Sequence, residues 1–191
     1  MVPMATQPVP RMTEEEYLAF ERQSDFKHEF IEGLILDMSG VREAHSLLET
    51  QLAFVFRTKL PKCRVYSSNL RVGVPGKSIY FYPDLSVTCA KPTFRDAEFD
   101  TLTNPTVIVE ILSASTENYD RGVKFEHCRA LESLRHYVVV HPDQTFIEHW
   151  SLGPDHRWVL DELRGGEALL HLAAVDAVIP LAEIYAPLSE R

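Results

Sequence analysis

The feature that most constrains this chain is an apolar, β-branched segment from Thr106 to Leu112 with one acid, Glu110, inside it. Such a segment is typical of a central strand that is buried on both faces. A carboxylate in such a strand is costly to bury unless it is paired with a cation or binds a metal ion. Glu110 is therefore the first candidate for a functional residue.

A second acid, Asp84, follows Pro83 inside another extended segment, which spans residues 79–89. Two carboxylates on neighbouring strands repel each other unless a cation lies between them. Mg²⁺ meets this demand because it favours oxygen ligands and takes one or two carboxylates plus waters. Each acid also has a plain alternative as a strand-edge residue that points at solvent. This alternative is as good as the functional one for Asp84, and weaker for Glu110, which has apolar flanks.

The remaining pattern predicts one α/β domain with a mixed β-sheet flanked by helices, over residues 13–191, after a flexible N-terminal tail at residues 1–12. Thr13 to Glu16 have the form of a helix capping box. An antiparallel hairpin is expected towards the C-terminus, with its turn at Gly153-Pro154-Asp155. The predicted helices span residues 13–23, 42–59, 115–132 and 181–185. The predicted extended segments span residues 26–38, 63–67, 70–74, 79–89, 106–112, 135–140, 146–152 and 158–163.

Composition favours a soluble globular protein, because 45% of the residues are hydrophobic and 25% are charged. No apolar run reaches the roughly 18 residues that span a bilayer. The N-terminal residues lack the pattern of a secretory signal, so the cytoplasm is the expected location. The cysteines, Cys63, Cys89 and Cys128, are scattered and odd in number. This argues against a disulfide framework and a structural zinc site, so reduced thiols are expected.

The net charge of −9 is unusual for a protein that binds nucleic acid. Such proteins gain affinity when Lys and Arg neutralise phosphates, and they usually carry a basic face. Two explanations remain open. The basic residues could cluster locally, or bound divalent cations could reverse the field at a carboxylate site.

Three segments of the chain together match one known protein family. They are Tyr82-Pro83-Asp84-Leu85-Ser86-Val87, Val109-Glu110-Ile111-Leu112-Ser113-Ala114-Ser115-Thr116 and Tyr119-Asp120-Arg121-Gly122-Val123-Lys124. The set resembles the Uma-two family, which is classed with restriction endonucleases in the PD-(D/E)XK nuclease superfamily. Glu29-Phe30-Ile31-Glu32-Gly33 and His45 match further elements of that family. The resemblance covers residues 13–185.

The resemblance implies a restriction-endonuclease-like core and a Mg²⁺-dependent DNA endonuclease, with Mn²⁺ as a possible substitute. It implies that Asp84 and Glu110 bind the metal and that the backbone carbonyl of Ile111 is a third ligand. The superfamily lysine usually lies two residues after the second acid, where this chain has Leu112. The Uma-two group shares this departure, which makes Lys124 the candidate for the ammonium near the attacking water and the phosphate.

The other implied site residues keep their alternatives. Lys124 could be an ordinary exposed helix lysine that pairs with Asp120 at i, i+4. Glu29 would lie near the metal, or would be one of several solvated acids. His45 would bind phosphate, act as an acid or base, or approach the metal. A helix-cap or structural histidine is an equal alternative.

The leading hypothesis is hydrolysis of DNA phosphodiester bonds by a homodimer, because two antiparallel DNA strands require two symmetric sites. No membrane partner is expected. A first alternative is a nuclease fold kept as a non-catalytic binding or regulatory module, which the acidic composition and the displaced lysine favour. A second is a metal-dependent phosphodiesterase that acts on small nucleotides, which suits the negative charge better than long DNA.

Overall fold

The structure is a computed structural model that describes residues 11–38, 40–113 and 117–188. Most of the tail expected at residues 1–12 lies outside the described residues. The same holds for Ser115-Thr116, the predicted start of the third helix.

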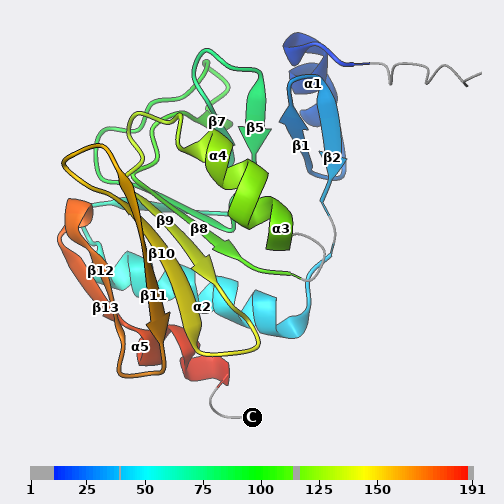
Figure 1. Cartoon of the computed structure of the whole chain (residues 1–191). Coiled ribbons are helices and arrows are strands. Elements are labelled where there is room, and N and C mark those ends of the chain that lie inside the picture. Colours follow the sequence, from blue (N-terminus) through cyan, green and yellow to red (C-terminus); the bar gives the residue numbers. More distant parts are fainter. Residues whose placement is uncertain (1–10, 39, 114–116, 189–191) are drawn as a thin grey trace, which may run out of the picture.

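A six-stranded mixed sheet forms the centre of the molecule, in the order β11-β10-β9-β8-β6-β3 (Figure 1). Its strands are β3 (Arg64–Ser67), β6 (Leu85–Thr88), β8 (Val107–Ile111), β9 (His136–Val140), β10 (Phe146–Leu152) and β11 (Trp158–Arg164). β8 and β9 run parallel, and the other neighbours in this sheet run antiparallel. The apolar strand β8 therefore lies between two partners, as its β-branched composition predicts. The antiparallel hairpin of β10 and β11 is also where it was expected.

A second, five-stranded sheet has the order β2-β1-β5-β4-β7. Its strands are β1 (His28–Ile31), β2 (Leu34–Asp37), β4 (Arg71–Gly73), β5 (Ile79–Phe81) and β7 (Thr101–Leu102). The prediction of one extended segment over residues 79–89 is wrong, because β5 and β6 belong to different sheets. Pro83 lies in the break, and it has no N–H group to continue a ladder. β7 and a two-stranded sheet of β12 (Leu169–Leu172) and β13 (Ala177–Pro180) were not predicted from the sequence.

The helices are α1 (Glu14–Glu21), α2 (Glu43–Lys59), α3 (Glu117–Tyr119), the π-helix η1 (Asp120–Lys124), α4 (Phe125–Cys128), η2 (Ala173–Val175), α5 (Leu181–Tyr185) and η3 (Ala186–Leu188). The helices α2 and α5 lie where they were predicted, whereas the first helix is slightly shorter and the third is broken. The predicted capping box at the start of α1 is present. The predicted helix over residues 115–132 is instead α3, η1 and α4, with the poor helix former Gly122 inside the π turn. No described helix is long and apolar enough to cross a membrane.

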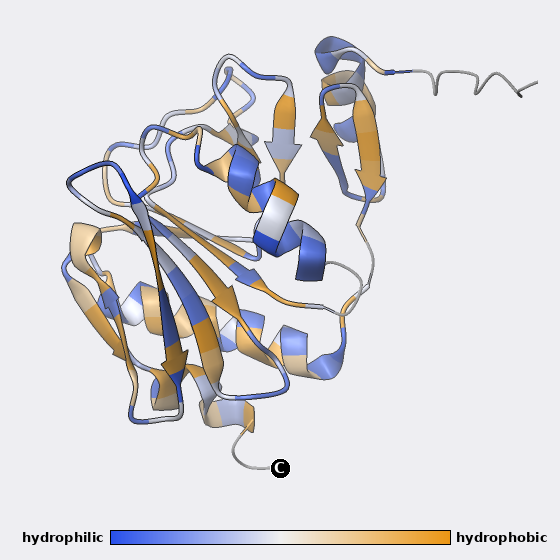
Figure 2. Ribbon diagram, in the orientation of Figure 1, coloured by the Kyte–Doolittle hydropathy of each residue, from blue (hydrophilic) through white to orange (hydrophobic). Residues whose placement is uncertain are grey.

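Alternate side chains of β8 enter two different cores. Val107 and Val109 pack in the core that contains α2, α5, β12 and β13. Ile108 and Leu112 pack in the core that contains α4, β4 and β5. In Figure 2, α2 carries both apolar and polar stretches, as expected for a helix that covers one core and meets solvent on its other side. Glu110 lies on the same face as Ile108 and Leu112, and this places it under η1.

Cys63 and Cys89 form a disulfide, which corrects the expectation of three reduced thiols. β3 and β6 pair antiparallel with Arg64 opposite Thr88, so the two cysteines lie opposite each other at the next position. Their separation of 26 residues says nothing about this register, so the bond could not be predicted from the sequence. Cys128 is a buried free thiol.

Two buried histidines form a hydrogen-bonded pair between β9 and β10. The N–H group of Ala174 donates to Nε2 of His136 (3.1 Å). The proton of the neutral His136 ring is therefore on Nδ1, which donates to Nε2 of His149 (2.9 Å). Burial is the main cause that lowers the pKa of both imidazoles to about 4.

We expect thiol titration of the denatured, unreduced chain to detect one thiol, from Cys128, and three after reduction. The Cys63→Ser/Cys89→Ser double variant is expected to lose on the order of 3 kcal/mol of free energy of unfolding, because the unfolded chain is no longer restricted. Urea unfolding measures this loss, and reduced wild type serves as the control. Three thiols before reduction would contradict the pairing.

We also expect acid to destabilise the protein through His136 and His149. Between their ordinary pKa of about 6.5 and the folded value of about 4, the unfolded chain takes up protons that the folded chain does not. The free energy of unfolding should fall by on the order of 1 kcal/mol per histidine from about pH 7.5 to about pH 5.5. His149→Gln should show a shallower fall in urea unfolding.

The matched control for this pH profile is His156→Asn. His156 is exposed in a turn at a φ of 59°, which asparagine tolerates. Its profile should follow that of wild type. A His149→Gln profile parallel to wild type would refute the role of the buried pair.

Candidate active site

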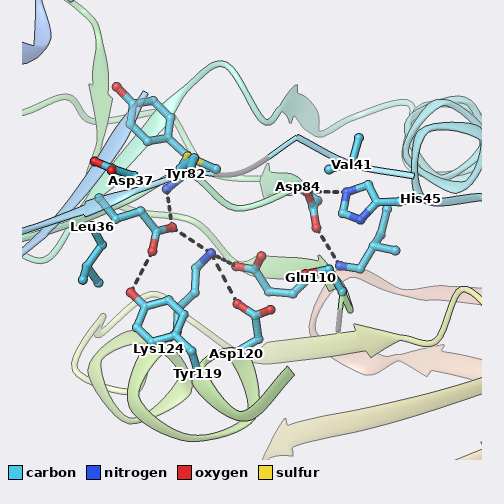
Figure 3. Close-up of a pocket in the computed structure, with 14 residues that line it drawn as sticks. Leu36, Asp37, Val41, His45, Tyr82, Asp84, Glu110, Tyr119, Asp120 and Lys124 are labelled. Carbon is cyan, nitrogen blue, oxygen red and sulfur yellow. Dashed lines mark hydrogen bonds and ion pairs between the residues drawn. The ribbon is translucent and has the colours of Figure 1, made fainter. Parts of the chain in front are cut away.

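The end of β8 meets a cavity of about 340 Å³ that is lined by both sheets, α2 and η1 (Figure 3). The structure brings every residue of the predicted site to this cavity. These residues are Glu29, His45, Asp84, Glu110, Ile111 and Lys124.

Glu110 from β8 and Lys124 from η1 form a buried ion pair, with 2.9 Å between Oε1 and Nζ. Nζ of Lys124 also lies 2.9 Å from Oε1 of Glu29 in β1. Asp120 completes the group, with Oδ1 3.8 Å from Nζ. Lys124 is 3% exposed, so it is not the exposed helix lysine of the alternative interpretation. Figure 3 shows its side chain extending towards Glu110 and Asp120.

The π turn explains how a lysine outside the usual position reaches this place. A π-helix widens one turn of a helix and is frequent at functional sites. Here Asp120 and Lys124, at the two ends of η1, are both buried and both line the cavity. Leu112, at the usual lysine position, instead belongs to the same apolar core as Phe125. The ammonium group is thus supplied by Lys124 from η1, which covers the same face of the sheet.

Both partners of the buried pair have shifted pKa values. Burial alone would lower the pKa of Lys124, but the charges of Glu110, Glu29 and Asp120 outweigh it and raise this pKa well above its ordinary value. Burial raises the pKa of Glu110, and the charges of Asp120, Asp84 and Glu29 add to this effect, while Lys124 opposes it. Shifts of this kind in a cavity are typical of functional sites.

Asp84 is held from two sides. Its Oδ1 accepts a hydrogen bond from Nε2 of His45 (3.0 Å), and its Oδ2 accepts one from the N–H group of Ile111 (2.6 Å). His45 lies in the first turn of α2 and is 6% exposed. Burial lowers the pKa of His45, but the hydrogen bond and charge of Asp84 outweigh it and raise this pKa. The structure thus gives His45 a hydrogen bond to Asp84, a contact that none of the open interpretations of His45 named.

The backbone of Ile111 lies beside Asp84, which its N–H group contacts. The N–H group of Leu112 bonds to Val140 in β9, and successive residues of a strand point their backbone groups to opposite edges. The N–H and C=O groups of Ile111 therefore point away from β9. No residue of β6 pairs with Ile111, because β6 begins at Leu85, opposite Val109. The carbonyl of Ile111 thus lies on the edge where Asp84 is.

Glu29 is buried in the site and is not one of several solvated acids. Its Oε1 accepts from the N–H group of Tyr82 (3.1 Å), and its Oε2 accepts from the hydroxyl of Tyr119 (2.7 Å). Tyr82, Tyr119 and Asp120 were not predicted as site residues. The i, i+4 spacing from Asp120 to Lys124 was a signal for Asp120, while a tyrosine that holds a distant carboxylate leaves none.

Among the described residues, no three His, Cys, Asp or Glu side chains stand in an arrangement that could hold a metal ion. Asp84 is turned towards His45 and Ile111, and Glu110 towards Lys124. The chemistry of the donors nevertheless fits a hard divalent cation. The carboxylates of Asp84 and Glu110 and the carbonyl of Ile111 are oxygen ligands, and Mg²⁺ needs few protein ligands beside its waters.

The mixed sheet with acids at the ends of two neighbouring strands places the chain in the class of restriction-endonuclease-like folds. A crystal structure from Anabaena variabilis, described as a "putative nuclease belonging to DUF820", has the same fold with a TM-score of 0.76 at 17% identity. The match covers 92% of this chain and 98% of that chain. The predicted fold class is therefore confirmed.

Residues 14–182 match the Uma2 family, described as "Putative restriction endonuclease", and the chain belongs to this family. An uncharacterized protein of Synechocystis sp. is 31% identical over 159 residues, which are 82% of this chain and 90% of the relative. A second uncharacterized Synechocystis protein is 32% identical over 164 residues, 85% of each chain. The resemblance inferred from the sequence motifs is confirmed.

We expect Lys124→Met to reduce the free energy of unfolding by about 3–5 kcal/mol at neutral pH, because it leaves Glu29 and Glu110 buried without their cation. The matched control is Lys59→Met, which removes the same charge from an ion pair with Glu183 in which both side chains are about a third or more exposed. That loss should stay below about 1 kcal/mol. Equal losses in urea unfolding would refute the dependence of the cavity on Lys124.

Proposed function

We propose that this protein is a Mg²⁺-dependent endonuclease that hydrolyses phosphodiester bonds of DNA, with Mn²⁺ as a substitute cation. The observation that carries the proposal is the arrangement of Asp84, Glu110 and Lys124 around one cavity at the ends of neighbouring strands. Two acids and one ammonium are the groups needed to hold a cation and to stabilise charge on a phosphate. Membership of the Uma2 family supports the same reaction class.

Asp84, Glu110 and the carbonyl of Ile111 are the groups that would hold the cation. When bound, Mg²⁺ supplies positive charge that activates the attacking water and stabilises the phosphate oxygens. In this proposal Asp84 keeps its orientation through His45, whose Nε2 donates to the oxygen on the side away from Ile111. His45 is thus a positioning residue for the acid.

Lys124 supplies the second positive charge. Its ammonium group donates to an oxygen of the scissile phosphate and stabilises the negative charge that develops there. Glu29 holds Lys124, and Tyr119 and the backbone of Tyr82 hold Glu29 in turn. This chain of contacts holds the lysine in place before the substrate enters.

The net charge of −9 favours a second candidate function, a phosphodiesterase that acts on small nucleotides. A small substrate needs no long basic surface. The other alternative, a binding module without catalysis, is disfavoured because Asp84, Glu110 and Lys124 all line one cavity.

A homodimer remains part of the proposal, since cleavage of both strands of a duplex requires two sites. A cytoplasmic location fits less well with the structure than with the sequence, because disulfides such as Cys63–Cys89 persist mainly in oxidising compartments.

Wild type is expected to nick supercoiled plasmid in Mg²⁺ or Mn²⁺, and EDTA should stop the reaction. Asp84→Ala and Glu110→Gln should lower the rate by roughly 10²-fold or more, because the cation loses a ligand. Glu98→Ala, which removes an exposed acid, is the control and should keep the wild-type rate. Agarose gels measure the conversion.

Other outcomes separate the candidate functions. Cleavage of small nucleotides without nicking of plasmid would replace the endonuclease with the small-nucleotide phosphodiesterase. No cleavage of either substrate would leave the binding module. Nicking that survives both Asp84→Ala and Glu110→Gln would refute the proposed site.

A further inference from the structure

A second cleft continues from the active-site cavity past the N-terminus of α2. Its volume is about 670 Å³, and it shares Val41, His45 and Ser113 with the cavity. Arg42 lines it from the start of α2, and Arg164 lines it from the end of β11. Positive side chains therefore line a path that leads out of the proposed catalytic site, in a chain whose net charge is −9.

Arg42 is an unfavourable residue for the position it holds. It is the N-cap of α2 and makes no side-chain capping hydrogen bond. Ser, Thr, Asp and Asn are preferred there because their oxygen accepts from the first turn. A positive charge at the positive end of the helix dipole is also unfavourable. A residue that breaks such a local rule beside a functional cavity points to a role in binding.

Arg164 is held in a defined orientation. Its guanidinium lies 3.7 Å from the ring centroid of Phe146, which packs against His141. Its ion pair with Glu162 is 3.1 Å long, but both side chains are more than half exposed, so the pair is weak. Stacking orients the planar guanidinium, which has five N–H donors, and the contact with Glu162 uses one nitrogen.

The other charged groups of the cleft do not cancel these two arginines. Arg121 also lines the cleft, but it is paired with Glu117 and with Glu148 (3.2 Å from Nε to Oε2). Asp143 is the second acid that lines the cleft, and it is exposed. Arg42 pairs with no carboxylate among the described residues.

We propose that this cleft binds the sugar-phosphate backbone of the nucleic acid strand that enters the cavity, with Arg42 and Arg164 each contacting a phosphate. The proposal rests on the proposed function, because the cavity determines which bond lies next to the cleft. Arginine suits this role because its planar fork matches the geometry of phosphate oxygens. A local path of positive charge also explains how an acidic protein can bind a polyanion.

The test is binding of a fluorescein-labelled oligonucleotide duplex to the full chain, measured by anisotropy against salt concentration in Ca²⁺ and in EDTA. Arg42→Ser and Arg164→Gln should each weaken binding and reduce the slope of log K against log salt by about 0.9. Arg57→Ser is the matched control, since Arg57 is an exposed arginine in the last turn of the same helix. It should leave affinity and slope unchanged.

Arg42→Ser has a second, opposite readout. Serine is a better N-cap than arginine, so the urea midpoint should rise while binding weakens. A weaker binder with a lower midpoint would indicate a structural role and would overturn the assignment of Arg42. Unchanged binding by Arg42→Ser and Arg164→Gln, or no binding by wild type in either buffer, would overturn the proposal for the cleft.

The binding assay and the plasmid-nicking assay together separate the proposal for the cleft from the proposal of an endonuclease. A wild type that fails to nick plasmid but binds through Arg42 and Arg164 would refute the catalytic proposal alone. A wild type that nicks plasmid while both variants bind normally would refute the cleft alone. Binding of inorganic phosphate, measured by calorimetry, without binding of the duplex would show a small-anion site and overturn the strand proposal.

Discussion

The ammonium group of Lys124 lies 2.9 Å from both Glu29 and Glu110, at a point where all three side chains are nearly inaccessible to water. These residues come from η1, β1 and β8, so one cation joins a helix to both sheets. Without Lys124, the buried carboxylates would repel one another and push β1 and β8 apart. The position of η1 on the sheet and the shape of the cavity both depend on this interaction.

The distribution of charge lowers the stability of the fold at the residues that line the cavity and the cleft. Three buried carboxylates around one lysine are expensive for folding, and all three line the cavity at the end of β8. Arg42 at the N-cap of α2 weakens its helix and places a positive charge beside the cavity. A net charge of −9 therefore does not describe every part of the surface, because Arg42, Arg121 and Arg164 all line one cleft.

Much of the fold follows from local patterns in the chain. The capping box at Thr13, the amphipathic helix α2 and the apolar strand β8 are all where periodicity and composition predicted them. The division of residues 79–89 between two sheets was not predicted, because Pro83 marks a break only when the register of both sheets is known. The disulfide of Cys63 and Cys89 was missed for the same reason.

For the site, the sequence by itself determined that Glu110 is a carboxylate in a buried strand, since its apolar neighbours leave it no route to solvent. Only the tertiary structure decided that Lys124 is its partner, that Glu29 joins them and that Asp84 is held by His45. The physical reason is the distance along the chain over which each kind of information acts. Hydrophobic periodicity encodes which way a side chain faces within its own element, whereas a buried ion pair depends on how elements distant in the chain pack together.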